Sequence, residues 1–291
     1  MKKKTVLKAI LILLCAAVIL AAAELWASAN MLVSRRYETV SAKITEDMDI
    51  VILSDLHGYD FRGALEKKIR SAEPDLILMD GDMVNSDGSG LDIVCDLIRE
   101  LQAAAPVFYS WGNHEVSCLK VIPDLKERME SAGCTVVEKN YADISAGNNT
   151  LRIGGLYEYA FGHNSGGYNK AGSAPDDVRL FLEDFTDTER YTLMLAHRPD
   201  SFIFGDVSET YAIDMVVCGH LHGGQIVVPF KGGLVGGDQG WFPEYVHGLY
   251  EKDLLHILIT SGLSAGKRKY PRIFNRPEVM ILHLKAGTGE E

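Results

Sequence analysis

From Asp49 onward, short runs of consecutive apolar residues alternate with longer segments in which apolar residues recur at helical spacing. The short runs predict buried strands at 50–53, 76–79, 107–110, 151–156, 192–196, 215–218, 254–260 and 279–284. Helices are predicted at 61–72 and 91–101, where apolar residues share one face. Strands that alternate with helices indicate an α/β fold with parallel pairing, and the later strands add antiparallel character.

The first 29 residues follow a different pattern. Four lysines, at positions 2, 3, 4 and 8, precede an unbroken apolar run from Ala9 to Ala23, which Leu25–Ala27 extend beyond Glu24. About 20 apolar residues cross a bilayer, and Trp26 suits the lipid–water interface. Residues 1–29 are therefore predicted to form a membrane anchor, with a cleaved signal peptide as the alternative. Either reading places the following chain outside the cytoplasm, because lysine-rich flanks stay on the cytoplasmic side.

The rest of the chain divides into three predicted parts. Residues 30–48 are mixed and polar, which predicts a tether. Residues 49–285 are predicted to form a single domain large enough for an enzyme, and residues 286–291 a tail. Within the domain, the glycine-rich stretch Gly223–Tyr250 follows the last candidate ligand. We expect this stretch to form a mobile rim that selects the substrate, with Trp241 and Phe242 as contacts.

Composition and charge exclude several classes of protein. Of the 291 residues, 47% are hydrophobic and 24% are charged, as in an ordinary globular protein, so a disordered or fibrous chain is excluded. The net charge is −11, and because residues 1–48 carry +3, the remainder carries −14. A surface this acidic repels a polyphosphate backbone, which argues against nucleic acid as the main partner. A phosphate-bearing substrate would need a local, strongly positive centre.

Such a centre is suggested by polar residues that directly follow the predicted strands. They are Asp55, His57, Asp82, Asn113, His114, His197, His220 and His222. The carboxyl ends of parallel strands are where open α/β sheets bind ligands. Carboxylate, amide and imidazole donors without thiolate suit Mn, Fe or Zn. In an extended segment residues i and i+2 point the same way, so D-x-H and H-x-H could each reach one ion.

Other common hydrolase and nucleotide-binding motifs do not fit. A zincin motif starting at His114-Glu115 would need histidine at position 118, which is Cys118. The sequence contains neither a G-x-S-x-G elbow nor a G-x-x-x-x-G-K-[ST] loop.

The polar motifs occur in the order D-x-H, G-D, G-N-H-[D/E], H, G-H-x-H, and this order resembles the calcineurin-like metallophosphoesterases. The matching residues are Asp55/His57, Gly81-Asp82, Gly112-Asn113-His114-Glu115, His197 and Gly219-His220-Leu221-His222. The resemblance spans residues 49–285 and is strongest to the membrane-associated bacterial branch. That further likeness lies in Ala196–Pro199, Gly219–Gln225 and the segment containing Ser261–Leu263, Arg272 and Pro277-Glu278. The branch has been linked to UDP-2,3-diacylglucosamine hydrolases of lipid A synthesis, which suggests a substrate class.

The resemblance implies a four-layer α/β/β/α sandwich, preceded here by the hydrophobic helix, and two metal ions. One ion would be held by Asp55, His57, Asp82 and His222. The other would be held by Asp82, Asn113, His197 and His220, so that Asp82 is shared. His114 would be the general acid, and Arg198 and Arg272 would add phosphate contacts. Purple acid phosphatases have a ligating tyrosine three residues after the shared aspartate, but Asn85 stands there in this chain, so no tyrosinate ligand is expected.

These expectations describe a dinuclear phosphoesterase in which a metal-bridging hydroxide attacks a phosphate ester or pyrophosphate. The expected substrate is a phosphorylated small molecule or lipid, such as a lipid-linked or nucleotide-sugar compound. Two alternatives remain: a phosphodiesterase for nucleotides or nucleic acid, and a metal-bearing scaffold without turnover. The complete ligand set and His114 favour an enzyme, because a scaffold is free to lose them.

Overall fold

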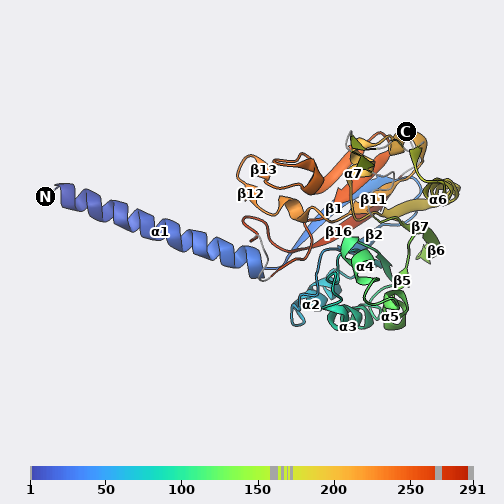
Figure 1. Ribbon diagram of the computed structural model, residues 1–291, viewed down its shortest axis with the longest axis horizontal. Coiled ribbons are helices and arrows are strands. Elements are labelled where there is room, and N and C mark those ends of the chain that lie inside the picture. Colours follow the sequence, from blue (N-terminus) through green and yellow to red (C-terminus); the bar gives the residue numbers. More distant parts are fainter. Residues whose placement is uncertain are drawn as a thin grey trace.

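Two six-stranded sheets face each other, with helices on their outer sides (Figure 1). The computed structural model describes residues 2–157, 163–164, 167–168, 170, 173–265 and 271–287. The first sheet contains, in spatial order, β1 (Val33–Ser41), β16 (Glu278–Ala286), β2 (Met48–Leu53), β3 (Leu76–Asp80), β4 (Val107–Ser110) and β5 (Thr135–Val136). The second sheet contains β14 (Gly248–Lys252), β15 (Leu255–Ile259), β11 (Met215–Cys218), β10 (Tyr191–Leu195), β7 (Asn149–Gly155) and β6 (Asn140–Ala146).

The helices of the two halves lie on opposite sides of the sheet pair (Figure 1). Those of the first half are α2 (Ala64–Arg70), α3 (Leu91–Leu101), α4 (Asn113–Cys118) and α5 (Leu125–Ala132). Those of the second half are α6 (Asp176–Thr186), α7 (Asp200–Phe204) and α8 (Val207–Thr210). Short hairpins are made by β8 (His163–Asn164) with β9 (Gly167–Tyr168) and by β12 (Val227–Val228) with β13 (Gly232–Gly233), and single 3₁₀ turns by η2 (His222–Gly224) and η3 (Gly237–Gln239).

Burial on both faces explains why the central strands are continuously apolar. In β2, Ile50 and Ile52 pack into the core between the two sheets, while Val51 and Leu53 pack against the α2 and α3 side. In β10, Leu193 faces the inner core and Met194 faces the helices of the second half. This arrangement confirms the α/β/β/α sandwich, because each sheet separates two apolar layers.

Most predicted elements agree with the structure to within three residues at each end. The strands at 107–110 and 215–218 and the helix at 91–101 have the predicted bounds. The helix predicted from residue 61 begins at Ala64, because Gly63 before it has a left-handed φ of 79°. Strands β2 to β5 are mutually parallel, so their carboxyl ends meet at one edge of the first sheet.

The tether expected at residues 30–48 is wrong for most of its length. Residues 33–41 form β1, which pairs in parallel with all nine residues of β16. Alternate β1 side chains are covered and exposed, as in an edge strand with one buried face. Its charged residues, which suggested a solvated segment, pair with neighbours: Arg35 lies 3.1 Å from Glu278, and Arg36 lies 2.7 Å from Asp49.

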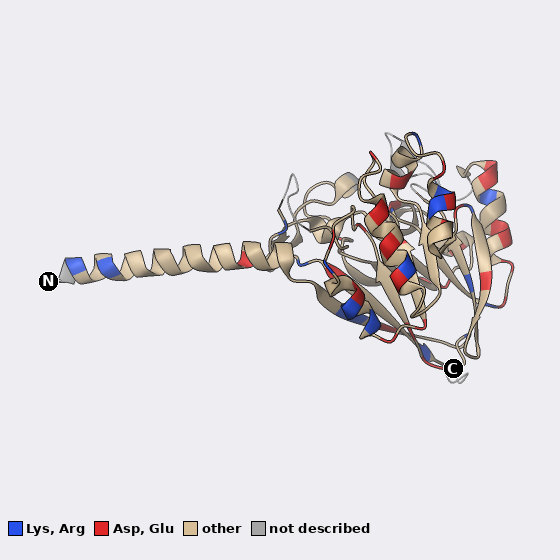
Figure 2. Cartoon of the chain, turned by 90° about the horizontal axis from the view of Figure 1, so that it is seen from below, with Lys and Arg blue, Asp and Glu red and all other residues tan. Residues whose placement is uncertain are grey.

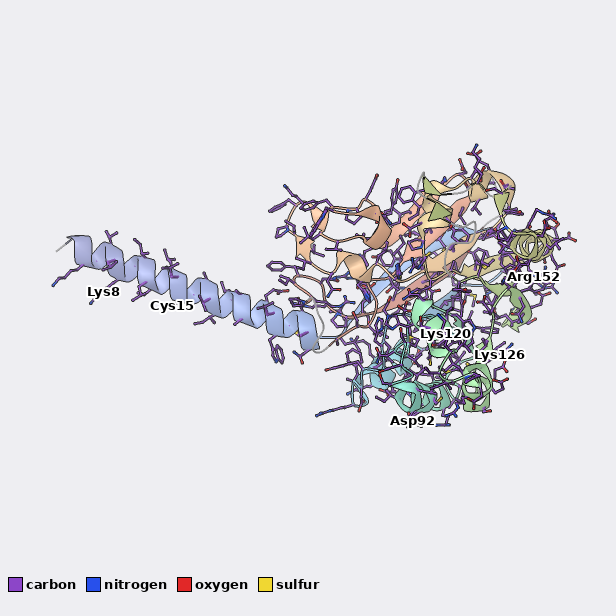
Figure 3. All side chains as sticks on the ribbon, viewed as in Figure 1. Lys8, Cys15, Asp92, Lys120, Lys126 and Arg152 are labelled. Carbon is purple, nitrogen blue, oxygen red and sulfur yellow. The ribbon has the colours of Figure 1, made fainter. Side chains whose placement is uncertain are left out.

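The amino-terminal segment forms one long helix, α1 (Lys2–Asn30), that lies clear of the sandwich for most of its length (Figure 1). Basic residues lie at its free end and one acidic residue near the sandwich (Figure 2). The side chains of Lys8 and Cys15 project away from the rest of the protein (Figure 3). By length and composition, Lys4–Asn30 is the one helix in the described chain that could cross a membrane. Its last turn differs, since Ala27 and Ser28 are buried against the sandwich.

Candidate metal centre

The predicted ligands follow the carboxyl ends of five strands, three in the first sheet and two in the second, and lie close together. Three groups of side chains each bring one donor atom per residue within 4.8 Å of one another. The groups are Asp55/His57/His222, His57/Asp82/His114 and Asp82/His197/His220. Because Asp82 and His57 belong to two groups each, the donors form one continuous cluster with room for more than one ion.

The backbone at these ligands differs from the extended geometry expected for D-x-H and H-x-H. Asp55, His57, Asp82, His220 and His222 all have positive φ, between 48° and 67°. A non-glycine residue in this left-handed region costs about 1–3 kcal/mol, a cost that recurs at functional sites. The side chains therefore converge through tight turns at the strand ends, and not through the pleat of an extended segment.

Two glycines make these turns possible. Gly81, before Asp82, has a φ of 68°, and a Cβ there would lie 2.4 Å from the backbone nitrogen of Gly112. A Cβ on Gly219, before His220, would lie 2.0 Å from the Ser54 hydroxyl oxygen. The first glycine is needed for conformation and close approach, the second for close approach alone.

Asp55 is oriented so that one oxygen faces the imidazoles. Its Oδ2 accepts hydrogen bonds from the Ser54 hydroxyl at 2.9 Å and from the His220 backbone N–H at 3.1 Å. Its Oδ1 lies 3.7 Å from His222 Nδ1 and 3.9 Å from His197 Nε2. This oxygen is buried and, within the described residues, has no hydrogen-bond partner.

His197 is held in the same way. Its Nδ1 lies 2.7 Å from the backbone carbonyl oxygen of Asp80, a contact that requires a proton on Nδ1. In the neutral ring the other nitrogen, Nε2, carries a lone pair, and it lies 3.4 Å from Asp82 Oδ2. A backbone acceptor that fixes the tautomer of a histidine is typical of metal ligation.

Asn113 completes the set as the first residue of α4. Its Oδ1 is buried and accepts no hydrogen bond from the part of the chain that the structure describes. The preceding Gly112 packs directly on Asp82, since a Cβ at Gly112 would lie 2.4 Å from Asp82 Oδ1. Buried oxygen atoms without partners cost free energy unless a cation or donor satisfies them, so this donor set fits metal ions.

The pKa values reflect the same crowding of buried charge. Burial raises the pKa of Asp55 to about 6, and burial together with the neighbouring His197 lowers the pKa of His220 to about 3. For His197, burial is outweighed by the Asp82 carboxylate, which raises the pKa to about 10. A cation beside these groups favours the ionised carboxylates and the neutral imidazoles that ligation needs.

Glu115, noted in the sequence only as part of a motif, is the main support of the Asp82 turn. Its buried carboxylate accepts backbone N–H groups of Asp82, Met83, Val84 and Gly112, together with the Tyr109 hydroxyl. These contacts tie the turn after β3 to the start of α4. Asn85 supports the backbone of another candidate ligand, because its Nδ2 donates to the His57 carbonyl oxygen at 3.0 Å.

Arg272, expected as a phosphate contact, is held by neighbouring protein groups. Its side chain is buried, at 5% exposure, and its guanidinium donates to the carbonyl oxygens of Ser261 and Gly262 and to the Ser264 hydroxyl. The same hydroxyl lies 3.2 Å from His222 Nδ1. Arg272 therefore supports the turn behind His222.

The remaining predicted contacts lie around the cluster. Arg198 is half-buried, and its charge helps to lower the pKa of His220. Trp241 is 73% exposed. Phe242 lines a cavity of about 530 Å³ that is also lined by Gly223, the residue after His222. The structure thus places the two aromatic residues on an open surface beside the cluster.

Comparison with known proteins gives consistent matches. The model of the family described as calcineurin-like phosphoesterase matches residues 48–224. The chain is 30% identical to the phosphodiesterase YaeI of Escherichia coli, over 81% of each chain. It is 27% identical to the uncharacterized metallophosphoesterase YkuE of Bacillus subtilis, over 81% of this chain and 79% of the relative. An uncharacterized metallophosphoesterase of Campylobacter jejuni is 28% identical over 83% of this chain, which spans 60% of that longer relative.

Proposed function

The chain belongs to the calcineurin-like phosphoesterase family, and from this premise we propose that it hydrolyses phosphate esters at a centre of two metal ions. The observation that carries the proposal is the orientation of the donors. Asp55, Asp82 and His197 each use one polar atom in a contact with the protein and direct the other into the shared cluster. A set of buried donors held in this way is pre-organised for metal.

Two groups of ligands would each hold one ion. Asp55, His57 and His222 would hold one, and Asn113, His197 and His220 the other, with Asp82 between them. Two bound cations would neutralise phosphoryl oxygens and lower the pKa of a water molecule. His114 adds an imidazole at the open side of the cluster, 30% exposed, where it can give a proton to a leaving oxygen.

The substrate class follows from charge and from the relatives. The acidic sandwich disfavours nucleic acid, and the E. coli relative is named a phosphodiesterase. We infer a phosphodiester or pyrophosphate substrate of small-molecule or lipid type, with Mn, Fe or Zn as the metal. Hydrolysis of nucleotides is the second candidate.

Hydrolysis by the full chain in detergent, followed as release of the leaving group, tests this function. We expect two metal ions per chain by elemental analysis after reconstitution with Mn²⁺, and Mn²⁺-dependent hydrolysis of bis-p-nitrophenyl phosphate. A panel of nucleotides, nucleotide sugars and phospholipids then ranks the substrates. A protein that holds two ions but hydrolyses none of these compounds would support the scaffold alternative.

We also propose that α1 anchors the protein with its sandwich on the extracytoplasmic face. The four lysines lie at the free end of α1, and such flanks stay cytoplasmic. Protease added to intact cells should therefore degrade the sandwich. Digestion only after lysis would show the opposite orientation, and release of a protein without residues 1–29 would indicate a cleaved signal.

A further inference from the structure

The end of α1 is built into the sandwich beside the metal cluster. Glu24 Oε1 accepts hydrogen bonds from the Ser28 hydroxyl at 2.7 Å and from the Phe274 backbone N–H at 3.1 Å. The next residue, Asn275, donates from its Nδ2 to the carbonyl oxygen of His222 at 2.7 Å. One short segment therefore contacts both the hydrophobic helix and a candidate metal ligand.

These contacts fix how close the sandwich lies to any membrane that α1 crosses. At 1.5 Å per residue, the 20 residues from Leu7 to Trp26 extend about 30 Å, the thickness of the hydrocarbon layer. Phe274 contacts Glu24, which lies within that length, so Phe274 stands at the boundary of the layer. Only Met31 and Leu32 separate α1 from β1, which leaves no linker to move the sandwich away.

The surface next to Phe274 carries exposed aromatic side chains. Phe230, in the β12–β13 hairpin, is fully exposed, and Trp241, Phe242 and Phe274 are 73%, 48% and 54% exposed. Phe242 and Phe274 line the same cavity of about 530 Å³, together with Lys231, whose Nζ lies 5.5 Å from the centre of the Phe242 ring. The hairpin lies on the side of the sandwich from which α1 projects (Figure 1).

We propose that this aromatic face, made of Phe230, Lys231, Trp241, Phe242 and Phe274, inserts into the headgroup region of the membrane in which α1 anchors the protein. Aromatic side chains with a lysine between them are the composition found at lipid–water interfaces, and lysine suits anionic headgroups. The proposal rests on the membrane anchor proposed above and not on catalysis. It places the cavity beside His222 at the level of the lipid headgroups.

Quenching of tryptophan fluorescence by brominated lipid tests this contact. The full chain carries Trp26→Phe, so that α1 itself gives no signal, and is reconstituted into phosphatidylcholine vesicles with one quarter phosphatidylglycerol, with or without dibromo-phosphatidylcholine. Trp111 is buried at 4% exposure, so Trp241 reports the aromatic face. The emission of Trp241 is the difference between this chain and a chain that also carries Trp241→Phe. Brominated lipid should quench most of that difference.

The matched control uses Leu254, which is 89% exposed in the turn between β14 and β15, outside the aromatic face. Adding Leu254→Trp to the Trp241→Phe chain should give emission that bromination leaves unchanged. A chain that floats with the vesicles but keeps its Trp241 emission would overturn the proposal and leave the anchor intact, as expected if a second protein copy covers this face. A chain that does not float with vesicles would overturn both. Neither outcome depends on turnover, so failure of the proposed hydrolysis is separately visible.

Discussion

Asp82→Asn should abolish paired metal binding and hydrolysis on every substrate. The side chain belongs to two of the three donor groups, and its Oδ2 lies 3.4 Å from His197 Nε2. Asparagine keeps the shape that packs on Gly112 but removes the charge that two cations would share. Loss of an outer contact to a metal ligand typically costs 10–100-fold, so loss of the shared ligand should cost more than ~10²-fold in kcat/KM. Elemental analysis and release of p-nitrophenol from bis-p-nitrophenyl phosphate, on the same sample, measure both effects.

Asp92→Asn is the matched control, because it removes the same charge from an exposed carboxylate on α3. It should leave metal content and hydrolysis unchanged. If the Asp82→Asn protein keeps two ions and its activity, Asp82 is not a shared ligand, and the assignment of the two sites is wrong.

The strands and the cluster could be predicted because burial leaves a simple signal. A strand covered on both faces is apolar throughout, as Leu76–Met79 is, and the polar residues that end it stand out. The positions of Asp55, Asp82 and His197 at the site follow from that pattern. The pairing order of the sheets does not, because β1 and β2 are separated in the sheet by β16, from the other end of the chain.

Edge strands and supporting residues leave weaker signals. In β1 only one face is covered, and the charges of Arg35 and Arg36 hide its alternation until their partners on β16 and β2 are known. The likeness to the family predicts Arg272 as a phosphate contact, but its hydrogen bonds to the Ser261 and Gly262 carbonyl oxygens and to the Ser264 hydroxyl depend on groups that only the fold brings near it. The role of Glu115 likewise depends on which N–H groups surround it.

Backbone conformation was the least predictable feature of the site. Nothing in the letters D-x-H or H-x-H distinguishes an extended segment from one in which both ends are left-handed. The glycines before Asp82 and His220 indicated turns, but the positive φ values extend to the ligands themselves. Local strain of this kind persists only when the surrounding packing fixes it, as Glu115 does for the Asp82 turn.

His114→Ala should keep both metal ions and lose turnover, because His114 is proposed as a proton donor and not as a metal ligand. The backbone N–H of His114, and not its ring, donates to Asp82 Oδ1 at 2.7 Å, so alanine preserves the support of the shared ligand. Loss of a general acid typically costs ~10²–10⁴-fold, and we expect a drop of that size for esters with alkoxide leaving groups. Esters of p-nitrophenol should be affected far less, because their leaving group needs no proton. Rates on both substrate types, with metal content measured in parallel, give the answer.

The structure also contains the competing arrangement, because His114 forms a possible metal group with His57 and Asp82, and its Nε2 lies 3.8 Å from Asp82 Oδ2. If His114 is a ligand, His114→Ala loses an ion and slows both substrate types equally. His256→Ala is the matched control, since this half-buried histidine of β15 contacts Thr39 of β1 and Glu251 of β14, away from the cluster. Equal slowing with both ions retained would assign His114 a purely electrostatic role. Only a drop confined to poor leaving groups, in a protein with two ions, identifies His114 as the proton donor.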